Sequence, residues 1–476
     1  MSGYWPIVDS DFREGNHFDF SGESLEIKNP DIPFYFFSSN VTMSDKNGNL
    51  IFYTNGCDVA NKNHEVMPNG YGLSPGDIAD EFCNDKGYPG IHQSVISIPA
   101  PGDDSLYYIF HQRSRNDTPN EGNTDRILYS KVDMRLENGL GDIVQKNQIL
   151  HDEYIQTGEM TLIKHSNGIA WWLIANSHGD NEYITFLIES DTITGPFSQN
   201  IGIPMLGSSG NGGSALVFSP DGSKMVRTNI KVNTYLYDFD RTTGQLSNFQ
   251  ELDFGNNFTS YGASFSPNGR FLYLSNTTEL YQVDMEADDL TDSAILIDEW
   301  NGGGTNIFPT NFYYHQLGPD CRIYINCFAT VEEIHIIHNP NEKGTACNFE
   351  QEALVLPYNY NITMAHHPNY RLDTPYPICD SSLIVTSTEL FRPLRQQVSI
   401  FPNPTNGPIN IHMPILPDQP MRIVVYNTFG QVVWSAERRT GDTEQQVDLS
   451  GLAAGIYVVQ VDLGARGVVT EKVILK

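Results

Sequence analysis

The chain has 476 residues and a formal net charge of −30, with 39% hydrophobic and 18% charged residues. A surface this acidic repels nucleic acid phosphates and anionic lipid headgroups, whereas it attracts cations such as Ca²⁺ or basic partners. No stretch reaches the roughly 18 apolar residues that a membrane helix needs, so no transmembrane segment is predicted.

Turn-forming residues are abundant along the whole chain, with 40 Gly and 27 Pro. Asn-Gly and Asp-Gly dipeptides supply the positive φ angles of tight hairpins, and alternating apolar runs follow many of them. Long helical patterns are hard to find. This combination predicts an all-β fold.

A turn followed by a hydrophobic strand recurs through the first 390 residues. The instances are "KNGNLIFYTNG" at 46–56, "GDDSLYYIF" at 102–110, "SNGIAWWLI" at 166–174, "SPDGSKMVRTN" at 219–229, "SPNGRFLYLSN" at 266–276 and "GPDCRIYINCF" at 318–328. Taking Gly48, Ser105, Gly168, Gly222, Gly269 and Cys321 as equivalent points, the spacings are 57, 63, 54, 47 and 52. A period near 50 is typical of a β-propeller. Six units are visible and there is room for one more, so we predict seven blades, with six and eight as alternatives.

The six cysteines can be placed on this repeat. Cys57 and Cys83 flank a long polar insertion that a disulfide would order, and we expect them to pair. Cys321 and Cys327 lie on one predicted strand, about 20 Å apart at roughly 3.3 Å per residue, while a bridge needs Cα atoms within about 7 Å. They should therefore not pair with each other, and each is either free or paired elsewhere. Cys347 and Cys379 are the next candidate pair. An even number of cysteines in a polar chain fits an oxidising compartment.

Two groups of residues are candidate metal ligands. The acidic stretch "DMEADDLTD" offers carboxylates for Ca²⁺, although it lacks the glycine of an EF-hand; the candidates are Asp284, Asp288, Asp289 and Asp292. Scattered histidines could converge on a metal in the channel of a propeller; these are His92, His111, His165, His178, His315, His366 and His367. None of them shows a local ligand spacing such as HExxH.

The search for catalytic motifs is negative. The chain contains no GxSxG nucleophile elbow and no phosphate-binding loop that opens a helix, so neither catalytic nor cofactor-binding residues are predicted. Tryptophans could stack on sugar rings; these are Trp5, Trp171, Trp172 and Trp300. Strand alternation turns one of the adjacent Trp171 and Trp172 into the core.

The last fifth of the chain differs from the rest. Segment 366–398 is rich in Pro and polar residues and is interpreted as the exit from the ring. Short strands then run to the last residue and predict a small immunoglobulin-like β-sandwich. We therefore expect a propeller at 1–390, a linker at 391–397 and a second domain at 398–476.

This second domain closely resembles the type A sorting domain of proteins exported by the type IX secretion system of Bacteroidetes-type bacteria. The matching residues are Phe401, Pro402, Asn403, Pro404, Gly407, Val425, Tyr426, Asn427, Gly430, Leu449, Leu452, Gly455, Tyr457 and the terminal Lys472 to Lys476. The resemblance implies contact with the type IX secretion machinery and a secreted or outer-membrane cell-surface location. No N-terminal leader is visible, and we interpret it as removed.

The first 390 residues resemble propeller-containing surface proteins of the same bacteria, a group that implies no activity. The similar stretches include "HNPNEKGTACNFEQEALVLP" and "HPNYRLDTPYPICD", which carry Cys347 and Cys379 and favour that disulfide. Three triplets that begin with Asp resemble the O-glycosylation acceptor of such bacteria. Their acceptor residues are Ser105, Thr192 and Ser293.

Together these patterns predict an exported binding or structural protein that serves adhesion, glycan capture or surface assembly. Its partners would be surface glycans or copies of itself, with Ca²⁺ as a candidate ion. The alternative is a secreted hydrolase or lyase with its active site in the propeller funnel. A funnel filled with side chains favours the first class, and a funnel with convergent ligands around a metal favours the second.

Overall fold

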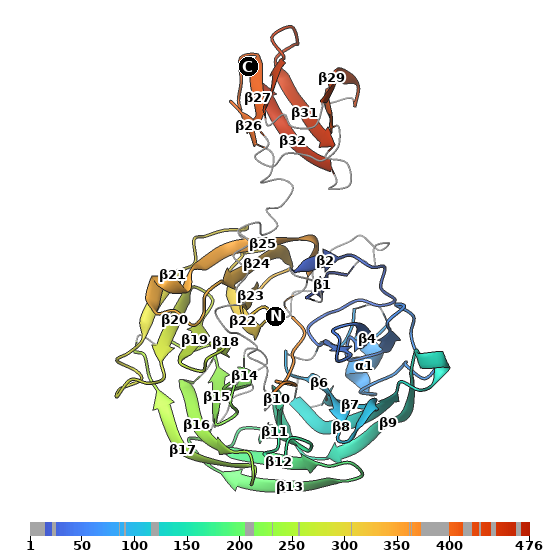
Figure 1. Cartoon of the computed structure of the whole chain (residues 1–476), viewed down its shortest axis with the longest axis vertical. Helices are drawn as coiled ribbons and strands as arrows, with labels where there is room; N and C mark the ends of the chain where they lie inside the picture. Colours follow the sequence, from blue (N-terminus) through green and yellow to red (C-terminus); the bar gives the residue numbers. More distant parts are fainter. Residues whose placement is uncertain are drawn as a thin grey trace. The chain divides into compact units, whose positions relative to one another are not determined.

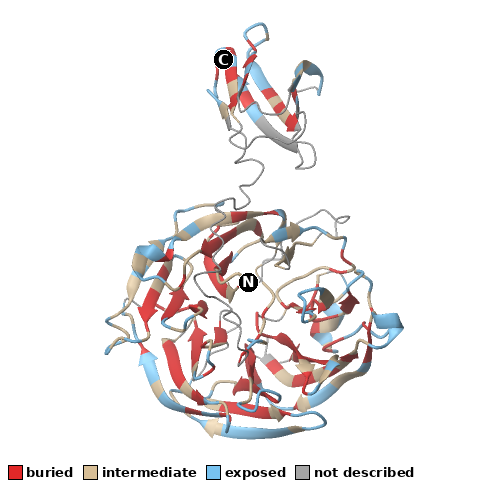
Figure 2. Cartoon of the chain, in the orientation of Figure 1, coloured by how far each residue is buried: buried red, intermediate tan, exposed pale blue. Residues whose placement is uncertain are grey.

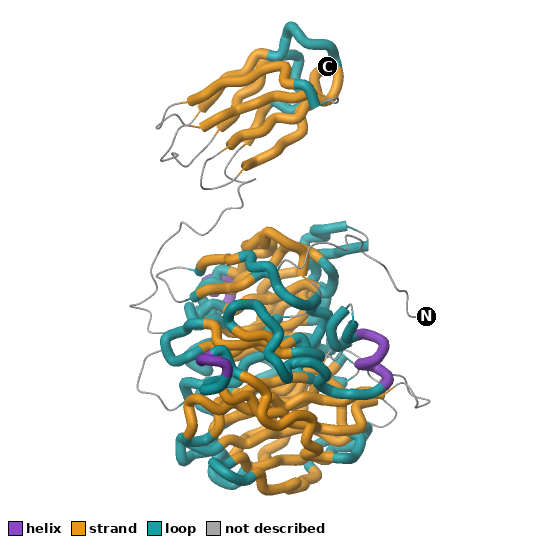
Figure 3. Tube along the Cα trace, turned by 90° about the vertical axis from the view of Figure 1, so that its right-hand side faces the viewer, coloured by secondary structure: helices purple, strands orange, loops and turns teal. Residues whose placement is uncertain are grey.

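The computed structural model describes residues 15–20, 25–84, 86–89, 92–115, 123–204, 214–230, 232–255, 258–305, 307–360, 362, 364–372, 399–412, 421–427, 430–438, 444–462 and 468–476. The chain separates into two compact units, Met1–Val385 and Thr386–Lys476. The predicted linker, residues 391–397, lies outside the described residues, so the predicted domain boundaries stay a prediction. Strands dominate both units, and helix is confined to short segments such as α1 (Asp77–Phe82) (Figure 3).

The first unit is a β-propeller whose strands form antiparallel sheets arranged in a ring (Figure 1). Blade 1 contains β3 (Val41–Ser44), β4 (Leu50–Thr54) and β5 (Val59–Asn61), and blade 2 contains β6 (Val95–Ala100), β7 (Asp103–Arg115), β8 (Asn123–Asp133) and β9 (Asp142–His151). Blade 3 contains β10 (Ile155–Lys164), β11 (Trp171–Ser177), β12 (Glu182–Ile188) and β13 (Ile193–Asn200). One residue pair, Ile155 with Thr124, links β10 to β8, so we treat blades 2 and 3 as separate.

The remaining blades each have four strands. Blade 4 contains β14 (Ser214–Phe218), β15 (Lys224–Asn229), β16 (Thr234–Asp240) and β17 (Gln245–Leu252), and blade 5 contains β18 (Gly262–Phe265), β19 (Phe271–Ser275), β20 (Glu279–Asp284) and β21 (Ile295–Glu299). Blade 6 contains β22 (Phe312–Leu317), β23 (Ile323–Cys327), β24 (Val331–Ile337) and β25 (Phe349–Tyr360). The described residues thus supply six blade sheets.

The six predicted landmarks lie at or beside the turns between the first and second strand of the six blades. In five of these turns the landmark residue donates its backbone N–H to the carbonyl three residues earlier, at 2.8 to 3.1 Å. Four of these five are glycines with φ between 73° and 86°, and the fifth is Cys321 with φ 69°. The positive φ of the turn therefore explains why the repeat was visible in the sequence.

Between blades 6 and 1 lies a short hairpin of β1 (His17–Asp19) and β2 (Glu26–Lys28) (Figure 1). Phe18, Leu25 and Ile27 of this segment pack on a cluster from blade 6 that includes Ile334 and Ile336. Two three-residue strands thus cover the face of blade 6 that has no neighbouring blade. The predicted count of seven blades is not confirmed by the described residues.

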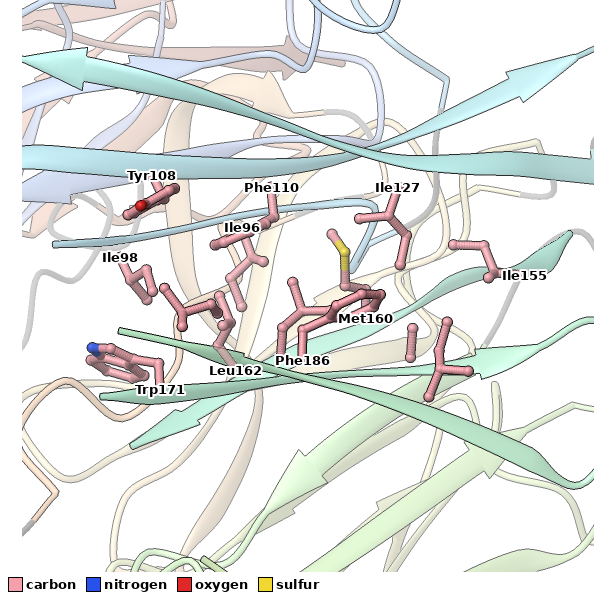
Figure 4. Packing of buried hydrophobic residues seen from close by; sticks show 14 of the residues in the cluster. Ile96, Ile98, Tyr108, Phe110, Ile127, Ile155, Met160, Leu162, Trp171 and Phe186 are labelled. Atoms are coloured by element: carbon pink, nitrogen blue, oxygen red, sulfur yellow. The ribbon is translucent and has the colours of Figure 1, made fainter. Parts of the chain in front are cut away.

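Burial follows the radius of the ring (Figure 2). Inner strands such as β10 and β18 are almost wholly buried, whereas the outer strand β13 is mostly exposed. Apolar clusters fill the spaces between blades, and Figure 4 shows the cluster between blades 2 and 3. Trp171, 2% exposed, belongs to this cluster, and Trp172, 4% exposed, lies on the opposite face of β11 in the cluster with blade 4. Both are core residues.

The second unit is a sandwich of two antiparallel sheets. One contains β26 (Ser399–Phe401), β27 (Pro408–His412) and β30 (Glu444–Asp448), and the other contains β29 (Val432–Arg438), β28 (Met421–Asn427), β31 (Gly455–Asp462) and β32 (Val468–Leu475). Alternate residues of both sheets form one apolar core around Ile411, Val425 and Val459. The predicted β-sandwich is confirmed. No helix in the described parts of either unit has the length and apolar character to span a bilayer.

Candidate functional site

The central channel of the propeller is occupied by the chain itself. A segment after blade 6, residues 362 and 364–372, crosses the middle of the ring and is drawn in orange in Figure 1; we call it the channel segment. Its first carbonyl, on Ile362, accepts a bond of 2.7 Å from Asn326 Nδ2 of blade 6. Residues 366–372, which sequence analysis assigned to the exit from the ring, therefore lie inside it.

Further bonds tie the channel segment to other blades. His367 Nε2 lies 3.3 Å from Thr42 Oγ1 of blade 1, and the Tyr370 hydroxyl donates to Ser97 O of blade 2 at 2.8 Å. Asn369 Nδ2 donates to Pro220 O next to β14 at 3.2 Å. Leu372 packs into the apolar cluster between blades 3 and 4. The segment thus acts as a hub that touches blades on several sides.

Four of the seven predicted channel histidines are buried; they are His92, His111, His315 and His366. His92 stacks on Tyr314 with ring centroids 4.2 Å apart. The centroid of the His366 ring lies 5.2 Å from that of His92. Burial lowers the pKa of His92 and of His315 to about 3. His165 and His178 lie away from this group, in turns of blade 3. No group of three or more His, Cys, Asp or Glu residues that could hold a metal ion is found among the described residues.

Two of the acidic candidates for Ca²⁺, Asp284 and Asp289, are engaged by other protein groups. Asp284 Oδ2 lies 3.1 Å from Arg270 Nη2 and 3.1 Å from Lys343 Nζ. The hydrogen bonds from Arg270 lower the pKa of Asp284, against a smaller opposing effect of burial. Asp289 Oδ1 accepts the backbone N–H of Asp292 at 3.0 Å, which closes the turn. The predicted Ca²⁺ site, which also included Asp288, is not confirmed.

The cysteines differ in part from the prediction. Cys57 and Cys83 form the predicted disulfide, with Cα atoms 5.5 Å apart. The pairing of Cys347 with Cys379 is wrong, because Cys347 is a free, buried thiol, as is Cys327. Cys321 is disulfide-bonded. The sixth cysteine, Cys379, lies outside the described residues.

The three predicted glycosylation acceptors differ in accessibility. Thr192 is exposed in the turn between β12 and β13, and Ser105 is partly exposed near the start of β7. Ser293 is partly buried, and its hydroxyl donates to Leu290 O at 2.7 Å. Of the three, Thr192 offers the most accessible hydroxyl, and glycosylation stays a prediction.

The insertion that follows β4 is held rigidly on the rim of blades 1 and 2. Besides the disulfide, Asn69 donates from its backbone N and its Nδ2 to the Asp142 carboxylate at 2.8 and 2.7 Å. Lys146 Nζ donates to Tyr71 O at 2.7 Å, and Asn147 Nδ2 donates to Gly72 O at 2.8 Å. All three partners belong to β9. The part of the insertion that follows β5 is thus tied to the outermost strand of the next blade.

A pocket of about 320 Å³ opens beside this insertion. Its walls come from the coil before β3, the turn after β4 and the insertion; the lining residues are Pro33, Phe34, Tyr35, Asp58, Val66, Tyr71, Cys83, Asn84, Lys86 and Gly87. Asn55 joins two of these walls, because its Nδ2 donates to Tyr35 O at 2.8 Å and its Oδ1 accepts Asp58 N at 2.9 Å. No local sequence pattern marks this pocket, since its walls come from separate segments of the chain.

Asn55 belongs to a set of residues that the sequence pattern could have revealed. In five blades an Asn lies within one residue of the end of the second strand, and these residues are Asn55, Asn176, Asn229, Asn276 and Asn326. Asn276 Oδ1 accepts the backbone N–H groups of Thr278 and Glu279, both at 2.7 Å, as Asn55 does two and three residues on. The "TN" and "SN" pairs at the ends of the quoted strands were the available signal.

The predicted sorting residues form one connected structure in the second unit. Asn403 Nδ2 donates to Lys472 O at 2.6 Å, and Asn403 Oδ1 accepts Ile474 N at 3.0 Å. The backbone of Thr405 continues this contact, with bonds to Ile474 O at 2.8 Å and from Lys476 N at 2.9 Å. We call these contacts the terminal clamp. The motif Pro402-Asn403-Pro404 thus holds the last strand, β32.

Two further sorting residues support the fold around the clamp. A Cβ at Gly407 would lie 2.0 Å from Ser450 Oγ, so a side chain there would collide with the loop after β30. Tyr457 donates its hydroxyl to Ala453 O at 2.7 Å and so closes the turn before β31, at whose start Gly455 lies.

Comparison with known proteins supports the sorting assignment. The family model of the secretion system C-terminal sorting domain matches residues 399–476. No curated protein matches the chain in sequence.

Similar solved structures include a functionally unknown protein from Desulfotomaculum acetoxidans, 15% identical over 76% of this chain and 98% of that chain, with a TM-score of 0.42. The periplasmic gluconolactonase from Pseudomonas aeruginosa is 10% identical over 86% and 98%, with a TM-score of 0.39. A putative 6-phosphogluconolactonase from Bacteroides fragilis is 15% identical over 68% and 95%, with a TM-score of 0.34. Similarity at this level carries no argument about activity.

Proposed function

We propose that this chain, which carries a type IX sorting domain at residues 399–476, is a binding protein that acts at the cell surface or after release. The sorting domain implies export and contact with the type IX secretion machinery. The propeller is then the part of the chain that binds other molecules outside the cell. Its role in this proposal is to hold a binding surface, in adhesion or glycan capture, on a rigid ring.

The observation that carries the proposal is the filled channel. The channel segment and the inner strands bond to each other, and Gln93 spans part of the channel through its Nε2 to Leu216 O at 2.8 Å and its Oε1 from Leu216 N at 2.7 Å. A hydrolase or lyase in the funnel would need room for substrate beside reactive groups. The side chains found there bond to the protein itself, which favours the rim over the channel as the working surface.

The rim offers a suitable element in the insertion of blade 1. It is tied by a disulfide and by the polar bonds to β9, and it presents Tyr71 with 62% of its surface exposed. An exposed aromatic ring on a loop of fixed conformation loses little entropy on binding. Rigid presentation of this kind suits recognition.

The test uses the bacterium that makes the protein. Antibody against the propeller should find the chain on the cell surface or in the medium, and a chain that ends at residue 398 should remain inside the cell. Purified, fluorescently labelled protein should then bind saturably to cells or to their isolated surface polysaccharide. Binding that does not saturate, together with turnover of a polysaccharide substrate, would overturn the proposal in favour of the enzyme.

A further inference from the structure

The pocket beside the insertion has the size and the construction of a small-ligand site. Its volume of about 320 Å³ falls at the lower end of the range of roughly 300–1,000 Å³ typical of such sites. Hydrogen bonds to backbone atoms hold three of its lining residues. The Asn55 side chain bonds to Tyr35 O and Asp58 N, and Lys146 Nζ donates to Tyr71 O. Because these contacts are made by the protein's own groups, they fix the positions of the three segments relative to one another.

The lining of the pocket includes three aromatic residues, Phe34, Tyr35 and Tyr71. Tyr71 is mostly exposed, Tyr35 is partly exposed, and Phe34 lies behind them in a cluster with Phe36 and Tyr53. The Phe34 and Tyr53 rings meet edge to face with centroids 5.4 Å apart. Packing therefore supports the aromatic wall from the protein side, while Tyr71 faces the solvent.

The rest of the lining carries hydrogen-bonding groups. Asp58 Oδ1 accepts the backbone N–H of Gly72 at 3.0 Å. Among the described residues, Asp58 Oδ2 takes no hydrogen bond and so remains to accept from a ligand. Asn84, whose Nδ2 donates to Asp80 O at 3.3 Å, supplies an amide, which both donates and accepts. Lys86, whose Nζ lies 5.3 Å from the centre of the Phe82 ring, supplies an ammonium group. The pocket thus combines a carboxylate, an amide and an ammonium group with aromatic surface.

We infer that this pocket binds one pyranose ring of a carbohydrate, an inference that rests on the binding function proposed above. A pyranose has an apolar C–H face, which packs on a tyrosine ring, and a rim of hydroxyl groups, which donate to a carboxylate and exchange bonds with an amide. The pocket is too small for several stacked sugars, so it takes a terminal or single exposed residue of a glycan.

The test is saturation-transfer difference NMR on the full chain with four probes: the methyl pyranosides of glucose, galactose, mannose and N-acetylglucosamine. At least one probe is expected to bind, with a dissociation constant on the order of 1 mM. Tyr71→Ala and Asp58→Asn should each weaken that binding by about tenfold or more. Asp58→Asn keeps an oxygen for Gly72 N, so the loop stays closed.

Matched variants separate the pocket from general effects of the surface. Tyr154, 48% exposed on blade 3, and Asp253, whose Oδ1 accepts Gly255 N at 2.9 Å, lie outside the lining. Tyr154→Ala and Asp253→Asn should leave binding unchanged. No transfer to any of the four probes, or equal losses in the pocket and control variants, would overturn the inference. The cell-binding test of the proposed function is independent, because a protein that binds cells but none of these sugars would refute only the sugar site.

Discussion

At the scale of single residues, the strongest electrostatic feature is a buried ion pair between blades 3 and 4. Glu159 and Arg227 are 0% and 1% exposed, and Arg227 Nε lies 2.8 Å from Glu159 Oε2. The pair lies where β10 departs from regular pairing with β11, between Ile155 and Met160. Burial raises the pKa of Glu159, while the charge of Arg227 acts against that shift. Burial is the larger of these two effects, so the net shift of the Glu159 pKa is upward.

We expect Glu159→Ala to lower the free energy of unfolding of the propeller by about 3–5 kcal/mol, because it leaves the Arg227 charge buried without a partner. The double variant Glu159→Leu with Arg227→Met should cost less than Glu159→Ala alone, since it removes both charges. Guanidinium unfolding followed by fluorescence measures the difference.

The exposed pair Lys224 and Asp238 provides the control. Their charged atoms also lie 2.8 Å apart, but the side chains are 35% and 38% exposed. Lys224→Ala should change the free energy of unfolding by about 0–1 kcal/mol. If the double variant costs as much as Glu159→Ala, or more, the buried charge is not the cause.

At the scale of elements, the terminal clamp explains why the sorting motif has residues at both ends of the second domain. The side-chain amide of Asn403 donates to and accepts from the backbone of β32, as a neighbouring strand would. It thereby covers part of an open edge. The residues of the sorting motif therefore also hold the last strand, β32, in place.

Asn403→Ala should therefore loosen β32. Loss of two hydrogen bonds, each worth about 0.5–1.5 kcal/mol, is expected to speed amide exchange of residues 468–475, measured by mass spectrometry on the full chain. Lys472→Ala is the matched control. The hydrogen bond from Asn403 goes to the backbone carbonyl of Lys472, which the substitution keeps, and the Lys472 side chain is exposed. Equal exchange in both variants would show that the clamp does not hold the strand.

The same scale shows what the sequence could predict. The blade turns could be predicted because each needs a residue with positive φ, and glycine adopts that conformation most easily. Cys321 is the exception, a residue other than glycine with positive φ. The hairpin β1–β2 could not be predicted, because its strands of three residues are too short to show an alternating apolar pattern. Cys347 was assigned to a disulfide from resemblance, whereas packing with Phe312 and Ile325 keeps it as a buried thiol. The pocket depends on contacts between distant segments, which no local pattern records.

At the scale of the whole propeller, burial makes stability depend on neutral histidines. The buried histidines among the described residues of this unit include His92, His111, His315, His335 and His366. Burial lowers the pKa of His111 to about 3 and of His335 to about 4. His111 Nδ1 lies 2.8 Å from Ser74 Oγ and its Nε2 lies 3.1 Å from Ser130 Oγ, so the neutral ring is held from both sides.

Acid should therefore destabilise the propeller earlier than its carboxylates alone would. In the unfolded chain each histidine takes up a proton as the pH falls through about 6.5. In the folded ring, the lowered pKa keeps His92, His111 and His315 neutral until about pH 3 and His335 until about pH 4. The unfolded state then binds more protons, so stability present above pH 6.5 is lost as the pH falls toward 4. Each buried histidine contributes a loss of up to about 1.4 kcal/mol per pH unit in this window.

The measurement is the free energy of unfolding at several pH values between 7 and 4.5. Carboxylates with lowered pKa, such as Asp284, add their own loss only below about pH 4.5, because that is where the unfolded chain protonates them. A steady fall between pH 6.5 and 4.5 thus reports the histidines. His111→Gln should reduce the slope by about one proton, whatever its effect at pH 7. Stability that stays flat down to pH 4.5 would mean that the rings are charged, or solvated, in the folded propeller.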